Sequence, residues 1–367
     1  MSRWRKTLYA AGGLAALVII GVAATAFGVE KSCVSTMPTP IVHSDFAITD
    51  EGYARPQGDS FLTFSEWYIV HAYNDLAGVT TRASESDFNY LTSIRGFWGS
   101  LCGATRQASA SGPASADQKM TNYIIGFSFT AEMGVIGGYE RTIGALSEWT
   151  TGGRKTAEDE FNAALLKEYG AFLYQTPWFR FPFGAKLRQF WRETPFVPSI
   201  RSIERRGSLS LQYAARGAYA ALMRFVAGYD PADLTIRSVV GGLAPPELAA
   251  MPDVKVIREV TDANGARGVL VETARYAAFD AFVRELGRHA GASLREVAGN
   301  HRILVTIVVP TGDAKFATTD GVAIFRLPVQ SSPGAQRIGI DTPIASLVQD
   351  IRDFEAAGYR FEHAYDY

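Results

Sequence analysis

The sequence predicts an α+β protein with one N-terminal transmembrane helix, then an all-α helical domain, then a C-terminal α+β sandwich. Three observations lead to this fold class. Leu8–Val29 is an uncharged apolar run, apolar residues recur at helical spacing from Phe61 to about Gly242, and alternating apolar residues begin near Asp253. The predicted division is an anchor (1–29), a linker (30–60), a helical domain (61–250) and an α+β domain (251–367).

The run Leu8–Val29 is long enough to cross a hydrocarbon core of about 30 Å as a helix. Arg3, Arg5 and Lys6 precede it without any acid, which predicts a cytoplasmic N-terminus. We therefore expect a single-pass protein of the inner membrane, with its body from Glu30 onward on the periplasmic or extracellular side. Cleavage of residues 1–26 as a signal peptide stays open, because they end in a small-x-small sequence.

Composition narrows the function classes. Cys33 and Cys102 are the only cysteines, and such a pair in an exported chain suggests a disulfide, although two unrelated thiols fit equally well. The net charge of −1 argues against a general nucleic-acid binder. The five histidines are scattered and no His/Cys group has zinc spacing, so we expect neither a metal nor a cofactor. Hydrolase and phosphate-loop motifs are missing.

Helical periodicity and capping signals place the elements of the second domain. Thr156 and Asp159, for example, form a capping box at the start of one helix. Residues 104–117 are rich in Ala, Ser and Gly and are predicted to form a loop. The predicted helices lie near residues 64–76, 90–101, 118–149, 157–176, 184–193, 199–227 and 231–239.

The last domain contains a weak internal echo. Val269–Thr273 and Ile338–Thr342 are each predicted to form a strand that ends in an acid and a helix-capping threonine. Each segment is followed by a predicted helix, a glycine and a further strand. The echo predicts two β-α-β units, with helices on one face of a mostly antiparallel sheet. Sandwiches of this kind carry many functions, so the fold alone selects none.

Three side chains are candidates for chemistry. Glu132 falls in the apolar series that includes Phe129 and Ile136, so we expect it to face the core, with Glu140 beside it. His71 is a possible partner on another helix. A carboxylate and an imidazole can form an ion pair, a proton relay or half of a metal site. They can equally form a hydrogen-bonded core pair that fixes the helix register.

Residues 178–228 are basic and aromatic. This composition suits a membrane–water interface or docking on another membrane protein, and it also suits an aromatic core with a solvated basic face. The interface candidates are Trp178, Phe179, Arg180, Phe183, Arg188, Trp191 and Arg192.

Two functions follow from these patterns. The first is a non-enzymatic accessory, assembly or interaction subunit that is anchored in the membrane beside a membrane complex. The second is an exported enzyme or small-ligand-binding protein with a site among the helices around Glu132, where Glu140 and His71 are the other catalytic candidates. A pocket that holds all three residues favours the second function, and a filled core favours the first.

Overall fold

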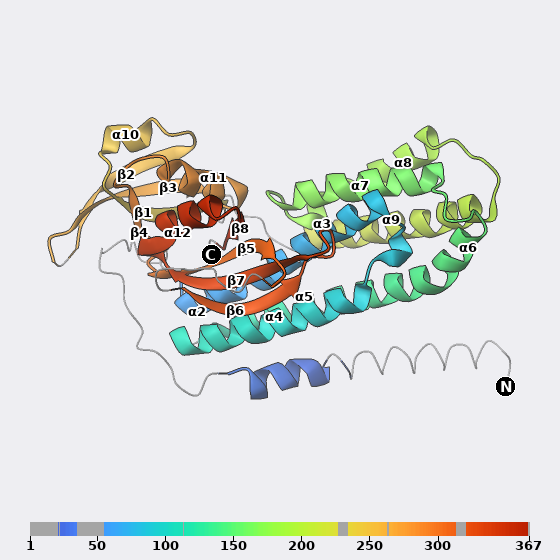
Figure 1. The fold of residues 1–367 in the computed structure, drawn as a ribbon, viewed down its shortest axis with the longest axis horizontal. Coiled ribbons are helices and arrows are strands. Elements are labelled where there is room, and N and C mark those ends of the chain that lie inside the picture. Colours follow the sequence, from blue (N-terminus) through green and yellow to red (C-terminus); the bar gives the residue numbers. More distant parts are fainter. Residues whose placement is uncertain are drawn as a thin grey trace.

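The computed structural model describes residues 21, 23–34, 55–112, 114–226, 234–262, 264–312 and 321–365. Helices fill the first part of these residues, and two antiparallel four-stranded sheets fill the last part (Figure 1). The predicted α+β class is confirmed. Among the described residues, no helix is both long and apolar enough to cross a membrane. The predicted span Leu8–Val29 lies largely outside the described residues.

The helical region packs around α3, which is buried on nearly all sides. Short turns follow α3, α5 and α7: the 3₁₀ turn η1 (Glu85–Asp87), the π-helical turn η2 (Glu140–Gly144) and the 3₁₀ turn η3 (Trp178–Arg180). The α-helices are α2 (Gln57–Leu62), α3 (Phe64–Arg82), α4 (Tyr90–Ser111), α5 (Ala116–Tyr139), α6 (Ala145–Trp149), α7 (Ala157–Leu173), α8 (Phe183–Glu193) and α9 (Ile200–Val226).

The structure corrects two boundaries in this region. The loop expected at 104–117 is shorter, because α4 continues to Ser111 through an alanine-rich stretch that favours the helix. The linker expected at 30–60 is also partly structured. Helix α2 begins at Gln57, and residues 23–32 form a helix beside α4 and α5. Residues 35–54 are not among the described residues.

The C-terminal region is built from two sheets rather than the single sheet expected. The first has the order β2-β3-β1-β4 and the second has the order β6-β7-β5-β8; we call them sheet A and sheet B. Sheet A consists of β1 (Thr235–Gly241), β2 (Val254–Thr261), β3 (Arg267–Ala274) and β4 (Ser293–Val297), with α10 (Pro245–Ala249) and α11 (Ala277–Leu286). Sheet B consists of β5 (Arg302–Pro310), β6 (Val322–Pro328), β7 (Ala335–Pro343) and β8 (Arg360–Ala364), with α12 (Ile344–Ala356).

One predicted helix is a strand. We expected a helix at 231–239 inside the helical domain, but residues 235–241 form β1, the strand between β3 and β4. The border placed at residue 250 therefore assigned this strand to the wrong domain. Its run Ile236–Val240 contains β-branched residues whose burial between two neighbours outweighs any local helical preference.

The two sheets are structural repeats. The echoing segments Val269–Thr273 and Ile338–Thr342 lie in β3 and β7, at the same place in each sheet. Thr273 pairs with Ile236 of β1, and Thr342 pairs with Ile303 of β5. The register shifts in β2 and β6, and those on β1 and β5, also fall at equivalent positions. The two units therefore share order, register and bulges.

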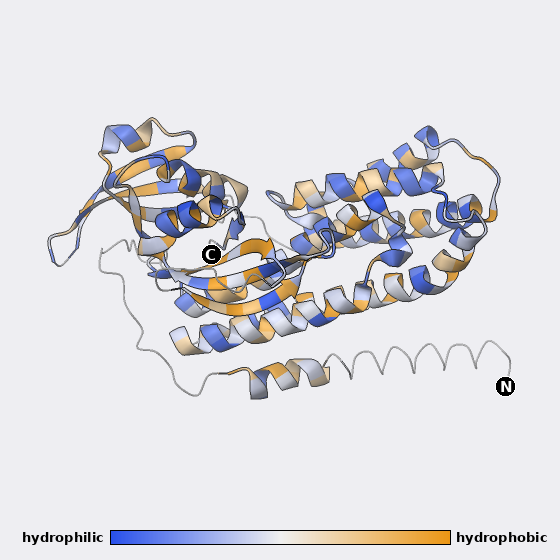
Figure 2. Ribbon diagram, viewed as in Figure 1, coloured by the Kyte–Doolittle hydropathy of each residue, from blue (hydrophilic) through white to orange (hydrophobic). Residues whose placement is uncertain are grey.

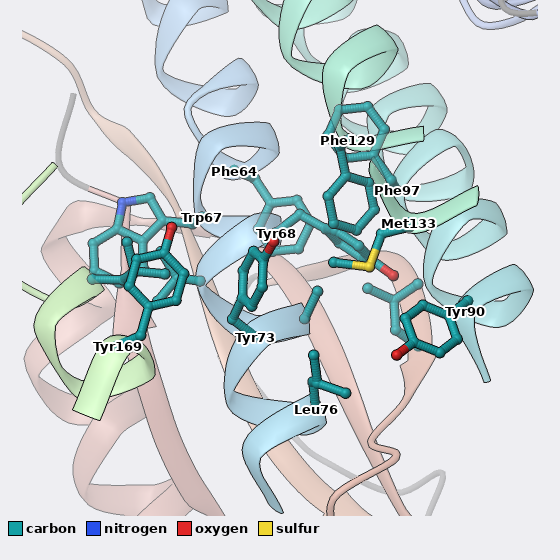
Figure 3. Packing of buried hydrophobic residues seen from close by; sticks show 14 of the residues in the cluster. Phe64, Trp67, Tyr68, Tyr73, Leu76, Tyr90, Phe97, Phe129, Met133 and Tyr169 are labelled. Atoms are coloured by element: carbon teal, nitrogen blue, oxygen red, sulfur yellow. The ribbon is translucent and has the colours of Figure 1, made fainter. Parts of the chain in front are cut away.

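Two large cores fill the molecule. One lies between the two sheets, α11 and α12, and contains side chains such as Val271, Ile307 and Ile340. The other surrounds α3, where Phe64, Trp67 and Tyr68 pack against the neighbouring helices and against sheet B (Figure 3). Because β5 is buried on both faces, it reads as an almost continuous apolar run.

Candidate functional site: three polar clusters and an outer apolar face

His71 lies in a polar cluster where α3 meets sheet B. Its Nε2 is 2.8 Å from the hydroxyl of Tyr365, which in turn lies 2.9 Å from the Thr306 hydroxyl. Its Nδ1 is 3.7 Å from Glu362, which binds Arg337. Burial, with the nearby positive charge of Arg337, lowers the pKa of His71 well below its usual value, so the imidazole is neutral at pH 7.

Glu132 is not buried as expected. Its side chain is 35% exposed, and Oε1 accepts a hydrogen bond of 2.9 Å from Nε of Arg216 on α9. The guanidinium of Arg216 also donates to the Tyr73 hydroxyl at 3.0 Å. The core-facing side of α5 runs through Phe129, Met133 and Ile136, so Glu132 lies at its edge. Phe129 and Ile136 of the predicted series are buried as expected, but Glu132 is not. Periodicity alone did not resolve this, because apolar residues occupy both faces of α5.

Glu140 lies in a third cluster, which is centred on Arg205. This guanidinium contacts Glu85 at 2.5 Å, Glu140 at 2.7 Å and Asp159 at 2.7 Å. Burial, together with the charge of Glu85, raises the pKa of Glu140 to about 8. Its second carboxylate oxygen has no hydrogen-bond partner among the described residues.

The local backbone explains how Glu140 reaches this position. It begins the π-helical turn η2, in which the carboxylate folds back over Gly144. A Cβ atom at Gly144 would lie 2.5 Å from Oε2 of Glu140, so a larger residue here would displace the carboxylate from its present position. Arg201 closes the turn by donating to the Gly144 carbonyl at 2.9 Å, and it also binds Asp159 at 2.8 Å.

The three residues predicted to share a site therefore lie in three separate clusters. Glu132 is bound to Arg216, Glu140 to Arg205, and His71 to Tyr365. None of them lines the cavity beside Asp75 and Gln330 or the groove between α4 and β6. Among the described residues, no group of His, Cys, Asp and Glu could hold a metal ion.

Sequence reasoning missed the buried partners. Arg201 and Arg205 are each 1% exposed, and only their i, i+4 spacing on the same face as Leu209 hinted at burial. His363 was also missed. Its Nδ1 lies 2.5 Å from Asp280, and its ring stacks on Trp67 with centroids 3.5 Å apart. No local signal links residues so far apart in the sequence.

The basic aromatic segment is largely part of the core. Phe183 is 1% exposed and packs on Tyr169, contrary to its expected exposure. Trp178 and Phe179 are half-buried, and Trp178 packs on Tyr219. Trp191, Arg180, Arg188 and Arg192 are exposed. The aromatic rings mostly fill the space between η3, α8 and α9 because each helix supplies one apolar side.

A different surface is exposed and apolar. It follows α5, η2 and α6 on one side and the antiparallel α9 on the other, and we call it the outer apolar face. Figure 2 shows hydrophobic residues, in orange, along these helices. Its large exposed side chains are Met120, Ile124, Phe127, Val135, Ile143, Leu146 and Trp149, together with Ile200, Ile203, Leu211, Tyr219, Leu222 and Phe225.

The outer apolar face carries few exposed charged side chains. Between Met120 and Trp149 the only exposed charged residue is Arg141, and between Ile200 and Phe225 the only one is Arg224. Other charged side chains of the same helices instead point inward, toward the Arg205 cluster and the Glu132–Arg216 pair. In soluble proteins, large exposed apolar patches are typical of surfaces that contact a partner or a membrane.

Glycines on the outer apolar face are also unusual. A Cβ atom at Gly134, Gly138 or Gly207 would meet nothing within 4 Å. The inward glycines differ, since a Cβ at Gly126 or Gly137 would collide with Phe97 or Tyr90. An interior helical glycine costs about 1 kcal/mol relative to alanine, and no packing within the described chain offsets that cost on the outer face.

The end of the predicted anchor is held against the body. Cys33 and Cys102 form a disulfide that joins residues 23–34 to α4. Glu30 accepts hydrogen bonds from Lys119 at 3.3 Å and from the Tyr123 hydroxyl at 2.6 Å, both on α5. Residues 23–34 therefore lie beside the first turns of α5, where the outer apolar face begins.

Comparisons with known proteins do not assign this fold or its sites to a class. No family model, no curated protein and no solved structure matches the chain. The geometry is therefore the basis for the function proposed below.

Proposed function

We propose that the protein is a membrane-anchored interaction subunit whose body lies on the exported side, where it acts as an accessory or assembly subunit of a membrane complex. The outer apolar face carries this proposal. Its exposed residues from Met120 to Trp149 and from Ile200 to Phe225 include only two charged side chains. Interface cores are depleted of charge and enriched in aromatic residues in the same way.

The proposed partner is an apolar transmembrane helix of another membrane protein. Three features support this choice over lipid alone. The face begins beside Glu30, directly after the uncharged run Leu8–Val29, so a bilayer reached by that run adjoins it. The open positions at Gly134, Gly138 and Gly207 allow a second helix backbone to approach closely. The inward ion pairs leave no charge to repel an apolar helix along most of the face.

A site-specific crosslink tests the partner surface. A photo-crosslinking side chain in place of Val135 or Leu211 should give a discrete protein adduct in native membranes, because both positions are exposed on the face. The matched control is the same side chain in place of Arg188, exposed on α8. Adducts to lipid only, or the same protein band from position 188, would contradict the proposal.

A filled-groove variant sharpens the same test. Gly138→Leu adds a side chain where there is open space and should stabilise α5, yet it should abolish the adduct from position 211. Gly184→Leu on α8 is the control, since the nearest atom to its new Cβ is the flexible end of Arg188 at 3.9 Å. Topology is tested separately: a reporter after Tyr367 that is active only in the cytoplasm would exclude an exported body.

A further inference from the structure

A second candidate surface, separate from the outer apolar face, lies beside the Cys33–Cys102 disulfide. Helix α4 runs along β6, the edge strand of sheet B (Figure 1). The two elements line an open groove of about 460 Å³. This volume is in the range of small-ligand sites. Cys102 lines the groove, so the disulfide to Cys33 places the end of the predicted anchor at its side.

The lining of the groove has two parts. Its rim carries Arg95 and Arg106 from α4 and Arg326 from β6, and none of its lining residues is acidic. Its floor is apolar and includes Ile324, Phe325 and Leu327. Among the described residues, neither Arg95 nor Arg106 forms an ion pair with a carboxylate. Two guanidinium groups at the rim of an apolar groove attract an anion that carries hydrocarbon.

Spacing places the two arginines on one face. Arg95 and Arg106 are three helical turns apart, so their Cα atoms are separated by about 16 Å along α4. Between them α4 presents Gly96, Gly99 and Gly103 to the groove. A Cβ at Gly103 would lie 2.6 Å from the Ile324 carbonyl oxygen, so this glycine lets α4 approach β6. A Cβ at Gly99 would meet nothing within 4 Å, which leaves room for a ligand.

An added peptide strand fits this groove less well. Strand β6 has only seven residues, its pairing with β7 shifts register around Ile324, and it ends at Pro328. A bulge, a charged side chain and a proline are features that disfavour strand addition at a sheet edge. The mixed lining instead suits an amphiphile with an anionic head.

We propose that the groove between α4 and β6 binds an anionic phospholipid, with the phosphate on Arg95 or Arg106 and an acyl chain along Ile324, Phe325 and Leu327. This site is separate from the outer apolar face. Only the choice of a bilayer lipid as the source of the anion rests on the proposed membrane anchoring, because the disulfide holds the anchor's end beside the groove.

Lipid binding can be measured on the full chain in a non-ionic detergent by native mass spectrometry. Phosphatidylglycerol should bind about tenfold or more tightly than phosphatidylcholine with the same acyl chains, since only the former has a net negative head group. The double variant Arg95→Gln/Arg106→Gln should lose this preference. Arg188→Gln/Arg192→Gln on α8 is the control of equal charge change and should keep it.

Gly99→Leu gives an independent test, because it fills the groove without changing charge. It should weaken binding of both lipids by about tenfold, and thermal unfolding in the same detergent should show an intact fold. Unchanged binding in both groove variants would overturn the proposal. So would displacement of phosphatidylglycerol by an equal concentration of inorganic phosphate, which would define a simple anion site.

The lipid measurement needs neither a partner protein nor a bilayer. Loss of the crosslinks from positions 135 and 211 would therefore refute the proposed function without affecting the groove. Conversely, a failure of lipid binding in detergent would leave the outer apolar face in place.

Discussion

Strands β1 and β5 occupy the same position in sheets A and B, but their surroundings differ. Arg237 of β1 pairs with Glu272, and Leu304 of β5 pairs with Asp341 at the equivalent position. Leu304 is fully buried against the helical region, whereas Arg237 is half-buried and forms an ion pair with Glu272 at 3.2 Å. One backbone pattern therefore supports an apolar side chain in one sheet and a charged one in the other.

The equivalent acids differ in the same way. Burial raises the pKa of Asp341, although Arg302 partly opposes the shift. Burial also opposes ionisation of Glu272, but hydrogen bonds from Lys255 and Arg237 outweigh it and lower that pKa. The comparison teaches that the repeat determines strand pairing, while the elements packed on each sheet determine burial and charge.

Exchanging the side chains at the equivalent position tests the comparison most strongly. Leu304→Arg places the residue found in sheet A into a fully buried site and should cost about 4 kcal/mol or more of unfolding free energy. Arg237→Leu should cost less than about 1 kcal/mol, because it removes only partly exposed interactions. Denaturant unfolding measures both. Equal losses of unfolding free energy would show that positions 237 and 304 do not differ in environment.

Breaking one ion pair in each sheet should give the next largest difference. Glu362→Gln leaves the buried Arg337 without its carboxylate and should cost about 3 kcal/mol at pH 7. Glu272→Gln breaks a more exposed pair and should cost about 1 kcal/mol or less. A cost for Glu272→Gln as large as that for Glu362→Gln would refute the difference in burial.

The loss of unfolding free energy caused by Glu362→Gln should depend on pH. Burial opposes ionisation of Glu362, but the Arg337 charge outweighs it and holds the folded-state pKa below the ordinary 4.5. The stabilisation is therefore complete above pH 4.5 and is lost as the pH falls toward the folded-state pKa. Unfolding measured at pH 7 and at about pH 3 should show a smaller deficit in acid, and a constant deficit would contradict this assignment.

The smallest expected effects are the contributions of Asp341 and Glu272 to the pH dependence of stability. The folded-state pKa of Asp341 is raised, so its ionisation makes stability fall as the pH rises above its ordinary value of 3.8. That of Glu272 is lowered, so stability rises as the pH approaches 4.5 from below. Relative to the parent chain, Asp341→Asn and Glu272→Gln should change the slope of stability between about pH 3 and pH 6 in opposite directions. Changes of the same sign would contradict the comparison.

Local signals predicted many elements correctly. The capping box at Thr156 starts α7, and the helices expected at 184–193 and 199–227 match α8 and α9. The echo between Val269–Thr273 and Ile338–Thr342 lies at equivalent strands. These features depend on residues close together in the chain, which is why sequence alone contains them.

The candidate sites were much less predictable. Glu132, Glu140 and His71 were expected together, yet they are bound to Arg216, Arg205 and Tyr365. Each of these partners is at least 65 residues away in the sequence. Periodicity placed Phe129 and Ile136 correctly in the core but misplaced Glu132, because α5 is apolar both toward the core and toward the outer apolar face.

Local signals were enough to predict the α+β class, most helix starts and the echo between β3 and β7, because caps, periodicity and turn residues act within a few positions. Long-range packing set which side of α5 is buried and which acids meet Arg205. It also set that sheet B is covered on both faces, whereas ion pairs lie on the side of sheet A that carries Arg237 and Glu272. Periodicity sets the relative directions of side chains on one element. It does not specify the direction from which a distant element packs against it, and that packing determines burial, pairing and pKa.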